Sequence, residues 1–231
     1  MSFLIDSLQS ALILIWALDP ELLKIISVSL KVSFSSTLIA GLIGIPLGLS
    51  IALNEFRGKR LLITIFNTLL ALPTVVIGLF VYSFITRKGI FGPLDLLYTQ
   101  KAIIIGQILL IVPVVTTFTI SAVSRIDDRY RKTAMTLGAD IIRTSYIIVR
   151  EARFGIVASI IIAFGRVIAE VGVSMMLGGN VKGFTRTMTT AMAMEYDKGE
   201  FVLSVALGIV LLFLSFLANL FFNYFQGRTR V

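Results

Sequence analysis

A polar, basic stretch at residues 124–155 divides a chain that otherwise consists of long apolar segments. Charged side chains are costly inside a bilayer, so a stretch this polar is expected to lie in water. An excess of Lys and Arg beside transmembrane segments is typical of the cytoplasmic side. We therefore expect a folded cytoplasmic region between membrane helices. Its basic residues are Arg125, Arg129, Arg131, Lys132, Arg143, Arg150 and Arg153.

The order of residues inside this stretch predicts a helix, a tight turn and a second helix. Ala134, Met135 and Leu137 form a short apolar face that ends at Gly138, a residue suited to the left-handed position just after a helix. Asp140 can then cap the next helix by accepting backbone N–H groups. The residues alone leave two interpretations open: a surface that another protein grips, and a hairpin that anionic lipid attracts to the membrane.

The composition places the whole chain in a membrane. Hydrophobic residues make up 57% of the 231 residues, and the mean hydropathy of +0.95 is too high for a soluble domain of this size. The formal net charge of +8 then reflects basic loops, so no nucleic acid partner is expected. The absence of Cys and His excludes disulfides, thiol nucleophiles, zinc sites built from these residues and imidazole acid/base chemistry.

The apolar segments predict an all-α integral membrane protein with a single transmembrane domain, residues 1–231. Residues 1–19 hold an apolar run shorter than the ~20 residues that a span needs, so we expect a peripheral interfacial helix there, with a sixth short span still open. More of the loop Lys and Arg fall on the side of the basic stretch, Arg228 and Arg230 among them, which predicts an N-terminus outside and a C-terminus inside. The five expected spans are residues 21–53, 61–84, 102–123, 156–177 and 201–225.

Glycines and prolines mark special positions inside these spans. Gly44 and Gly48 lie four residues apart in the first span, a spacing that lets another helix approach closely. Pro73 and Pro113 are expected to bend the second and third spans, because proline removes a backbone hydrogen bond. Bent helices are tolerated where they are buried or line a cavity, so the pair suggests a gate. Kinks are also common in inert packing.

Arg166 and Glu170 are the ionisable residues deep in the apolar sequence of the fourth span. Four-residue spacing places them on one helix face, where each is expected to neutralise part of the other's charge. Charges inside a membrane are by default a hypothesis of function, and here they suggest a transport pathway. A clamp between helices or between two subunits is the alternative interpretation.

Residues 181–200, which follow Asn180 at the end of the fourth span, are expected to form an outer loop. Its hydroxyl and cationic donors could face an oxyanion at the outer mouth of a pathway. A hydrated loop without any ligand would have the same composition, so the donors alone do not identify a substrate. They are Thr185, Arg186, Thr187 and Thr189.

With the spans placed, two motifs resemble one family. Lys132-Thr133-Ala134, three residues, Gly138, nine residues and Ile148 match the spacing of the coupling loop of ABC importer permeases, although Lys132 and Thr133 replace the Glu and first Ala of that motif. The second motif comprises Ala169 to Gly172, Met175 to Asn180 and Gly183 to Ala191, and it resembles permeases of the molybdate/tungstate type, in particular those for tungstate uptake.

The resemblance implies a five-span type I ABC importer permease bundle in the plasma membrane of a prokaryote, with a cytoplasmic coupling helix-turn-helix. Two copies would form the pathway along a two-fold axis, and an extracytoplasmic binding protein would deliver an oxyanion, by resemblance tungstate. A cytoplasmic ABC ATPase dimer would bind ATP and Mg. The residues expected to dock on it are Lys132, Thr133, Ala134, Met135, Leu137, Gly138, Ala139 and Asp140.

The chain itself is expected to be a permease subunit and not an enzyme. It contains no Gly-x4-Gly-Lys-Ser/Thr phosphate-binding loop, so ATP hydrolysis belongs to a partner. We expect no catalytic residue, cofactor or metal on it, because its acidic residues apart from Glu170 fall in loops or at helix ends. Permeases for molybdate, sulfate or phosphate remain alternatives, and so does an ion-coupled secondary transporter that uses Glu170.

Overall fold

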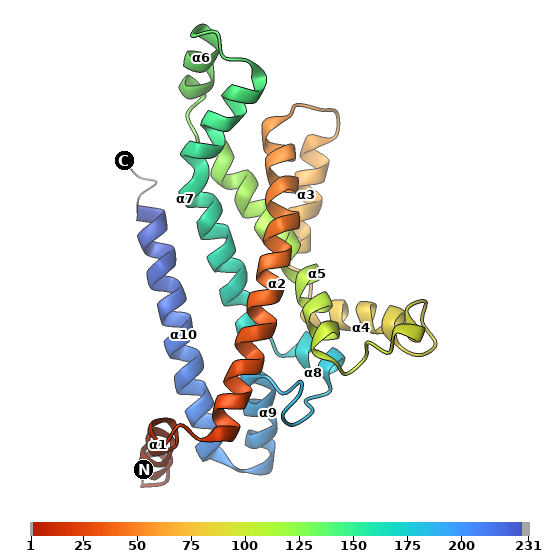
Figure 1. The fold of residues 1–231 in the computed structure, drawn as a ribbon, viewed down its shortest axis with the longest axis vertical. Coiled ribbons are helices and arrows are strands. Elements are labelled where there is room, and N and C mark those ends of the chain that lie inside the picture. Colours follow the sequence, from red (N-terminus) through yellow and green to blue (C-terminus); the bar gives the residue numbers. More distant parts are fainter. Residues whose placement is uncertain (1, 228–231) are drawn as a thin grey trace.

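Four long helices form the upright bundle of the molecule (Figure 1). The computed structural model describes residues 2–227, with side chains described from residue 6 to residue 224. Every regular element in this part of the chain is a helix. Arg228 and Arg230, which contribute to the predicted orientation, lie outside the described residues. The long helices are α2 (Pro20–Leu53), α5 (Gln100–Ser124), α7 (Ile141–Ile168) and α10 (Phe201–Gly227).

The first long helix, α2, packs closely along α5. Asp19 caps its start, accepting hydrogen bonds from the backbone N–H groups of Glu21 and Leu22 at 2.9 and 3.0 Å. Gly44 and Gly48 face α5, and a Cβ atom built on Gly48 would come within 2.8 Å of the Thr116 carbonyl oxygen. The predicted close helix contact is therefore present.

The second expected span is two helices, α3 (Lys59–Leu69) and α4 (Thr74–Ile85), which meet at an angle of 98°. Pro73 is the residue immediately before α4, so the predicted break lies at the expected residue. Because of the bend, α4 projects sideways from the bundle, with the short 3-10 helix η1 (Gly92–Leu94) near its far end (Figure 1). By contrast, α5 continues as one α-helix through the buried Pro113.

The fourth expected span, residues 156–177, is not a single helix. Its first part belongs to α7, which begins at Ile141 in the basic stretch and runs without a break to Ile168. A second, short helix, α8 (Gly172–Gly178), follows at an angle of 60°. The basic stretch therefore reaches deep into the bundle through one continuous helix.

Two shorter helices lie at the end of the bundle opposite the basic stretch (Figure 1). The N-terminal helix α1 (Ser2–Trp16) packs on α10 through the fully buried Ala11, whereas Trp16 is 91% exposed. The helix α9 (Met188–Lys198) lies inside residues 181–200. The prediction that these residues form only a loop is therefore wrong.

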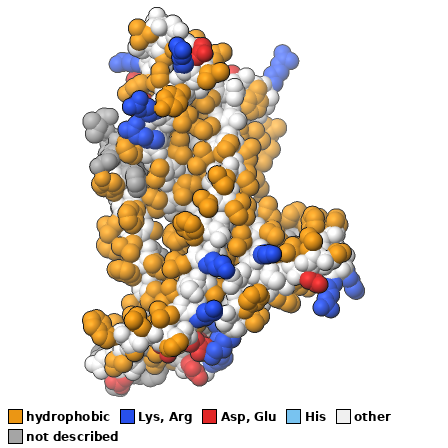
Figure 2. All heavy atoms as spheres, in the orientation of Figure 1, with side chains coloured by type: hydrophobic (Ala, Val, Ile, Leu, Met, Phe, Trp, Pro, Cys, Tyr) orange, Lys and Arg blue, Asp and Glu red, His pale blue; other side chains and the backbone are white. Residues whose placement is uncertain are grey.

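The described residues support the expected number of spans. Three helices are long and apolar enough to cross a membrane, namely α2, α5 and α10 up to Tyr224, and the two bent pairs raise this number to five if each pair is one span. The largest apolar core joins α2, α4, α5, α7 and α8. Apolar side chains also cover much of the flank of the bundle, as a lipid-facing surface requires (Figure 2).

Candidate functional site

The basic stretch folds as predicted into a helix, a turn and a second helix at one tip of the molecule (Figure 1). The first helix, α6 (Asp128–Thr136), is capped by Asp127, which accepts from the Arg129 N–H at 2.9 Å. Gly138 has a φ of +80°, the left-handed conformation that glycine adopts without steric cost. Asp140 caps α7 by accepting from the Arg143 N–H at 2.8 Å.

The turn exposes large apolar side chains among basic ones. Leu137 is 82% exposed and Met135 57%, whereas Ala134 is the one predicted docking residue that is buried. The first turn of α7 adds Ile141 and Ile142, which are 79% and 78% exposed. The predicted docking residues do not include these two, although consecutive isoleucines directly after a capped turn were a visible signal. An exposed apolar cluster with a polar surround is typical of a protein interaction surface.

A second candidate region lies where the two helix breaks meet. The Arg166 Nη2 atom, in the last turn of α7, lies 3.5 Å from the carbonyl oxygen of Leu70, the C-cap residue directly after α3. On the other side of the breaks, a Cβ atom built on Gly172 would come within 2.8 Å of Thr74 Oγ1, so the starts of α8 and α4 almost touch. The two broken spans are thus adjacent at the level of their breaks.

Arg166 and Glu170 do not share a helix face, because α7 ends at Ile168, between them. The expected neutralisation is therefore wrong: no ion pair joins these two residues, nor does Arg166 pair with any other carboxylate of the described residues. Arg166 is exposed. Glu170 is only 7% exposed, and its Oε1 atom accepts from the Val173 N–H at 3.1 Å in the first turn of α8.

A buried amide joins three helices next to these breaks. Gln107 of α5 is 1% exposed, and its Oε1 atom accepts from the Ser36 hydroxyl of α2 at 2.8 Å. Its Nε2 atom donates to the Val167 carbonyl oxygen at 3.4 Å, in the last turn of α7. The same carbonyl oxygen also accepts from the Glu170 N–H at 3.2 Å, so the amide adds a side-chain bond from another helix at the point where α7 ends.

The predicted outer donors lie inside the protein and bond to it. Thr185 is fully buried, and its hydroxyl donates to the Gly178 carbonyl oxygen at 2.6 Å. Thr187 caps α9, and its backbone N–H donates in return to Thr190 Oγ1 at 2.9 Å. Thr189 donates to the Glu170 carbonyl oxygen at 2.7 Å. The Thr189 bond holds α9 against the break after α7. Because these hydroxyls bond within the protein, the alternative of a hydrated loop does not describe them.

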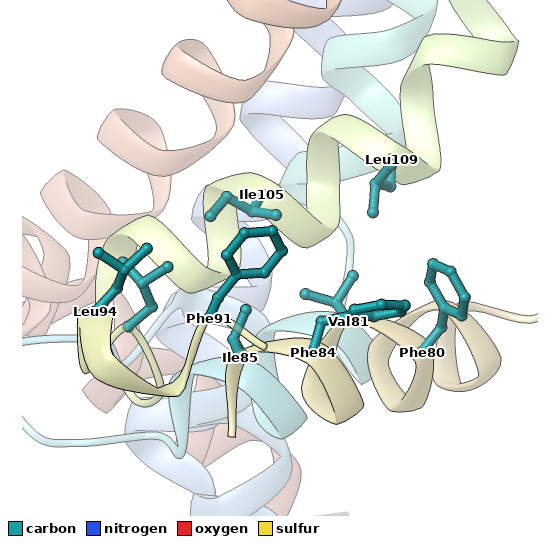
Figure 3. A pocket seen from close by; sticks show the side chains of 9 residues that line it. Phe80, Val81, Phe84, Ile85, Phe91, Leu94, Ile105 and Leu109 are labelled. Atoms are coloured by element: carbon teal, nitrogen blue, oxygen red, sulfur yellow. The ribbon is translucent and has the colours of Figure 1, made fainter. Parts of the chain in front are cut away.

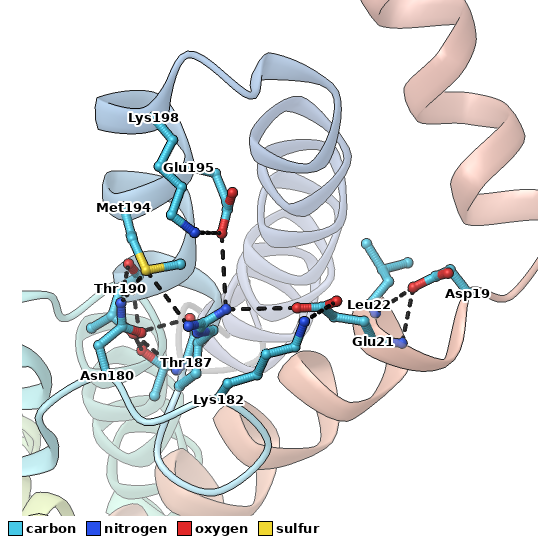
Figure 4. A network of polar contacts seen from close by, with 11 residues as sticks. Asp19, Glu21, Leu22, Asn180, Lys182, Thr187, Thr190, Met194, Glu195 and Lys198 are labelled. Carbon is cyan, nitrogen blue, oxygen red and sulfur yellow. Dashed lines mark hydrogen bonds and ion pairs between the residues drawn. The ribbon is translucent and has the colours of Figure 1, made fainter.

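Arg186 lies between two carboxylates at the end of the bundle that carries α1 and α9. Its Nη1 atom lies 3.6 Å from Glu21 Oε1 of α2 and 3.8 Å from Glu195 Oε1 of α9 (Figure 4). Lys182 and Lys198 contact the same two carboxylates at 2.7 and 3.2 Å. Asn180 donates to the Thr190 carbonyl oxygen at 3.3 Å, and its Nδ2 atom lies 3.3 Å from the Met194 sulfur, which is 3.5 Å from Arg186 Nη2.

An apolar cavity of about 440 Å³ separates the projecting α4 from α5 (Figure 3). Phe80 and Phe84 of α4 face Ile105 and Leu109 of α5 across it, and Phe91 reaches in from the loop. A charged oxyanion would lose its hydration there without gaining a hydrogen bond, so this cavity does not fit such a substrate. The described residues also contain no group of three or more Asp and Glu placed to hold a metal ion.

In the described residues, up to five candidate spans, two of them broken at adjacent points, and an exposed helix-turn-helix define the class of the molecule as an all-helical, multi-span membrane protein. The chain belongs to the family of binding-protein-dependent transport system inner membrane components, whose model matches residues 44–231.

Named relatives agree with this family. The chain is 36% identical to the tungstate uptake system permease protein TupB of Peptoclostridium acidaminophilum, over 95% of this chain and 96% of that protein. It is 36% identical to a probable anion ABC transporter permease protein of Haloferax volcanii, over 90% and 92% of the two chains. The molybdenum transport system permease protein ModB of Escherichia coli is 26% identical, over 85% and 93%.

Solved structures show the same fold at lower sequence identity. The MetNI methionine ABC transporter in an inward-facing conformation matches with a TM-score of 0.71 and 17% identity, over 91% of this chain and 96% of that chain. A bacterial alginate ABC transporter matches with a TM-score of 0.72 and 17% identity, over 100% and 90%. The fold is therefore that of the type I ABC importer permeases.

Proposed function

We propose that this chain is the permease subunit of an ABC importer that carries tungstate into the cytoplasm, powered by ATP hydrolysis on a separate subunit. The observation that carries the proposal is the 36% identity to a TupB protein over 95% of the chain. A second TupB protein, from Campylobacter jejuni, is 35% identical over the same share. Two copies of the chain would enclose the pathway, and an extracytoplasmic protein would deliver the anion.

The exposed turn between α6 and α7 is the proposed docking surface for the ATPase. Exposed apolar side chains are removed from water when a partner docks on them, and this surface offers Leu137, Ile141 and Ile142. The basic residues around them can pair with acidic groups of a partner. Gly138 shapes the tip: nothing lies within 4 Å of a Cβ atom built on it, so the turn presents a small, open edge.

The continuous helix α7 links this surface to the broken spans. At about 1.5 Å per residue, its 28 residues extend over roughly 42 Å. A helix of this kind moves as a rigid element, so a displacement of the docked turn would reach the break after Ile168. There it would change the contact between Arg166 and the end of α3, beside the break at Pro73. Glu170 follows the end of α7, and Pro113 lies buried within α5; both are parts of the proposed gate.

Arg166 is the proposed contact for the anion inside the membrane. Its guanidinium faces no carboxylate among the described residues, and guanidinium groups bind tetrahedral oxyanions through paired hydrogen bonds. Arg186 is a weaker candidate in this conformation, since Glu21 and Glu195 oppose its charge. The remaining polar residues have the proposed role of positioning α8 and α9 at the outer end of the pathway. They are Asn180, Thr185, Thr187 and Thr189.

Docking is tested by recovering the tagged permease in mild detergent from its native host. We expect an ATPase with a phosphate-binding loop to accompany the wild type and to be lost with Gly138→Trp. Gly58→Trp is the matched control, because Gly58 also has a positive φ, of +94°, and open space around its Cβ position. If Gly138→Trp retains the ATPase, the turn is not the docking surface.

Transport is tested by measuring cellular tungsten after exposure to tungstate. Arg166→Gln is expected to reduce uptake at least tenfold, the effect of about 1.4 kcal/mol on a binding or transition state, while Arg166→Lys retains part of it. Molybdate is the second candidate substrate, since the relative ModB is named for molybdenum. Tungstate uptake that an equal concentration of molybdate abolishes would favour molybdate as the substrate. Uptake that survives ATP depletion and follows an ion gradient would instead indicate a secondary transporter.

A further inference from the structure

A pocket of about 280 Å³ lies between α5, α7 and α10 at the end of the bundle that carries the docking turn. Its lining comes from the last turns of α5, the middle of α7 and the last third of α10. The α10 helix is the least buried of the long spans: only 11% of its most apolar window is buried, compared with 61% for α5. The pocket therefore lies at the flank where lipid meets the protein. Its lining includes Phe118, Ser121, Arg125, Gly155, Ser159 and Phe222.

The lining of this pocket includes a cation with no partner carboxylate. Arg125 is the C-cap residue directly after α5, and in the described part of the chain no acidic group lies within ion-pair distance of it. The nearest acidic neighbour in sequence, Asp127, is engaged with the backbone and side chain of Arg129. Ser121 adds a hydroxyl group to the same lining one turn earlier in α5.

The rest of the lining is largely apolar. Phe118, Ile162 and Phe222 come from three different helices and supply side chains without hydrogen-bonding groups. Ser159, also in the lining, donates to the Ile156 carbonyl oxygen at 2.7 Å, so its hydroxyl is already satisfied as a donor and can still accept. A ligand that matches this mixed lining has an anionic head and a hydrocarbon portion.

We propose that this pocket binds one anionic phospholipid from the leaflet at the docking-turn end, with the phosphate against Arg125 and the start of an acyl chain against Phe118 and Phe222. Basic pockets between transmembrane helices on the cytoplasmic side are recognised as sites for anionic headgroups. The volume is at the lower end of ligand pockets, which span ~300–1,000 Å³. It therefore holds the head region and the first part of a chain, and the remaining lipid lies along α10.

Other occupants fit less well. A free oxyanion would contact Arg125 but would leave the aromatic side chains without a partner and exposed to water. A helix of another protein is about 10 Å across and is too large for this volume. The bound lipid would fill the gap between α10 and the pair α5 and α7, beside the base of α6, so it is expected to steady the support of the docking turn.

The test uses the full chain, purified in detergent and examined by native mass spectrometry. Phosphatidylglycerol and phosphatidylcholine with identical acyl chains serve as the anionic and zwitterionic probes. We expect one phosphatidylglycerol per chain to be retained in preference to phosphatidylcholine. Arg125→Gln is expected to weaken this retention about tenfold, the size of effect of one charge-assisted hydrogen bond, and Arg125→Lys to restore part of it.

The control is Arg57→Gln, which removes one exposed charge at the same end of the molecule but away from the pocket. It is expected to bind lipid as the wild type does. The proposal is overturned if both lipids bind equally, if Arg125→Gln binds phosphatidylglycerol like the wild type, or if inorganic phosphate alone is retained with the same dependence on Arg125. Ser121→Leu, which enlarges a lining side chain without changing charge, is expected to weaken retention if the lipid binds in the pocket and to leave it unchanged if the lipid is only attracted to the charge.

Discussion

The side chains of Arg186 and Glu195 lie 3.8 Å apart at the end of the bundle that carries α1 and α9, and they are only 10% and 5% exposed. Neither residue has its charge balanced by water, because both are almost completely buried. Glu21 of α2 and Lys198 of α9 complete the cluster, at 3.6 Å from Arg186 and 3.2 Å from Glu195. This cluster joins the first helix of the bundle to a helix that follows the broken fourth span.

The cluster predicts a large loss of stability for Arg186→Met. Removing one partner from a buried ion pair costs ~3–5 kcal/mol, since the other charge is left without compensation. Because Lys198 offsets part of this loss, we expect a cost at the lower end of that range. The measurement is a lower apparent melting temperature in detergent. Lys182→Met is the control, because Lys182 is 66% exposed and surface ion pairs are worth ~0–1 kcal/mol. A variant Arg186→Met that melts like the wild type yet loses uptake would indicate a direct contact with the anion.

The turn glycine Gly138 is expected to tolerate no Cβ atom without strain. Its φ of +80° costs an L-residue ~1–2 kcal/mol, even though the space around it is open. Gly138→Ala should therefore increase amide hydrogen exchange at Ala139, whose N–H donates to Ala134 at 3.0 Å. Gly165→Ala is the counterpart: it lies within α7, has open space around its Cβ position and should stabilise the helix by ~0.5–1 kcal/mol. Equal exchange in wild type and Gly138→Ala would contradict the assigned strain.

The close contact between α2 and α5 predicts that a larger side chain at Gly48 destabilises the protein. A Cβ atom on Gly48 would lie 2.8 Å from the Thr116 carbonyl oxygen and 2.7 Å from Thr119 Cβ, so Gly48→Val must push the two helices apart. Overpacking of this kind costs ~1–3 kcal/mol and more when backbone must move. We expect a lower yield of folded protein and a lower melting temperature. Leu47→Val, at the neighbouring exposed position, should change neither.

The features that could be predicted from the sequence depend on chemistry within a few residues. Gly138 ends a helix because its own backbone permits a positive φ, and Asp140 caps the next helix by reaching a group three residues ahead. The break at Pro73 is similarly local. The five-span arrangement follows from apolar length, which each segment carries by itself.

The features that the sequence did not reveal depend on contacts between distant residues. The end of α7 before Glu170 is stabilised by Gln107, which lies on another helix and donates to the Val167 carbonyl oxygen. Glu21 opposes Arg186 only because the fold brings the start of α2 to this loop. The helix α9 had a local signal: Thr187 and Thr190 have the spacing of a capping box, although Thr replaces the usual Glu or Gln.

The buried carboxylate of Glu170 distinguishes a structural role from ion coupling. Its Oε1 atom accepts from the N–H of the fully buried Val173, so it caps α8 at the break of the fourth span. Glu170→Gln keeps an acceptor oxygen of the same reach, and we expect near-normal uptake and melting temperature. Glu170→Ala leaves the Val173 N–H without a partner, which costs ~1–3 kcal/mol, and should lower both.

Glu151→Gln and Glu151→Ala serve as controls for the change in charge, since Glu151 is exposed on α7 and makes no ion pair with another described residue. The decisive comparison is between the two Glu170 variants. If uptake requires only the cap, Gln retains it and Ala does not. If uptake requires a proton or cation to bind the carboxylate, both variants abolish transport while Gln leaves the melting temperature unchanged. That second pattern would indicate that Glu170 serves ion-coupled transport, and it would count against ATP-driven import.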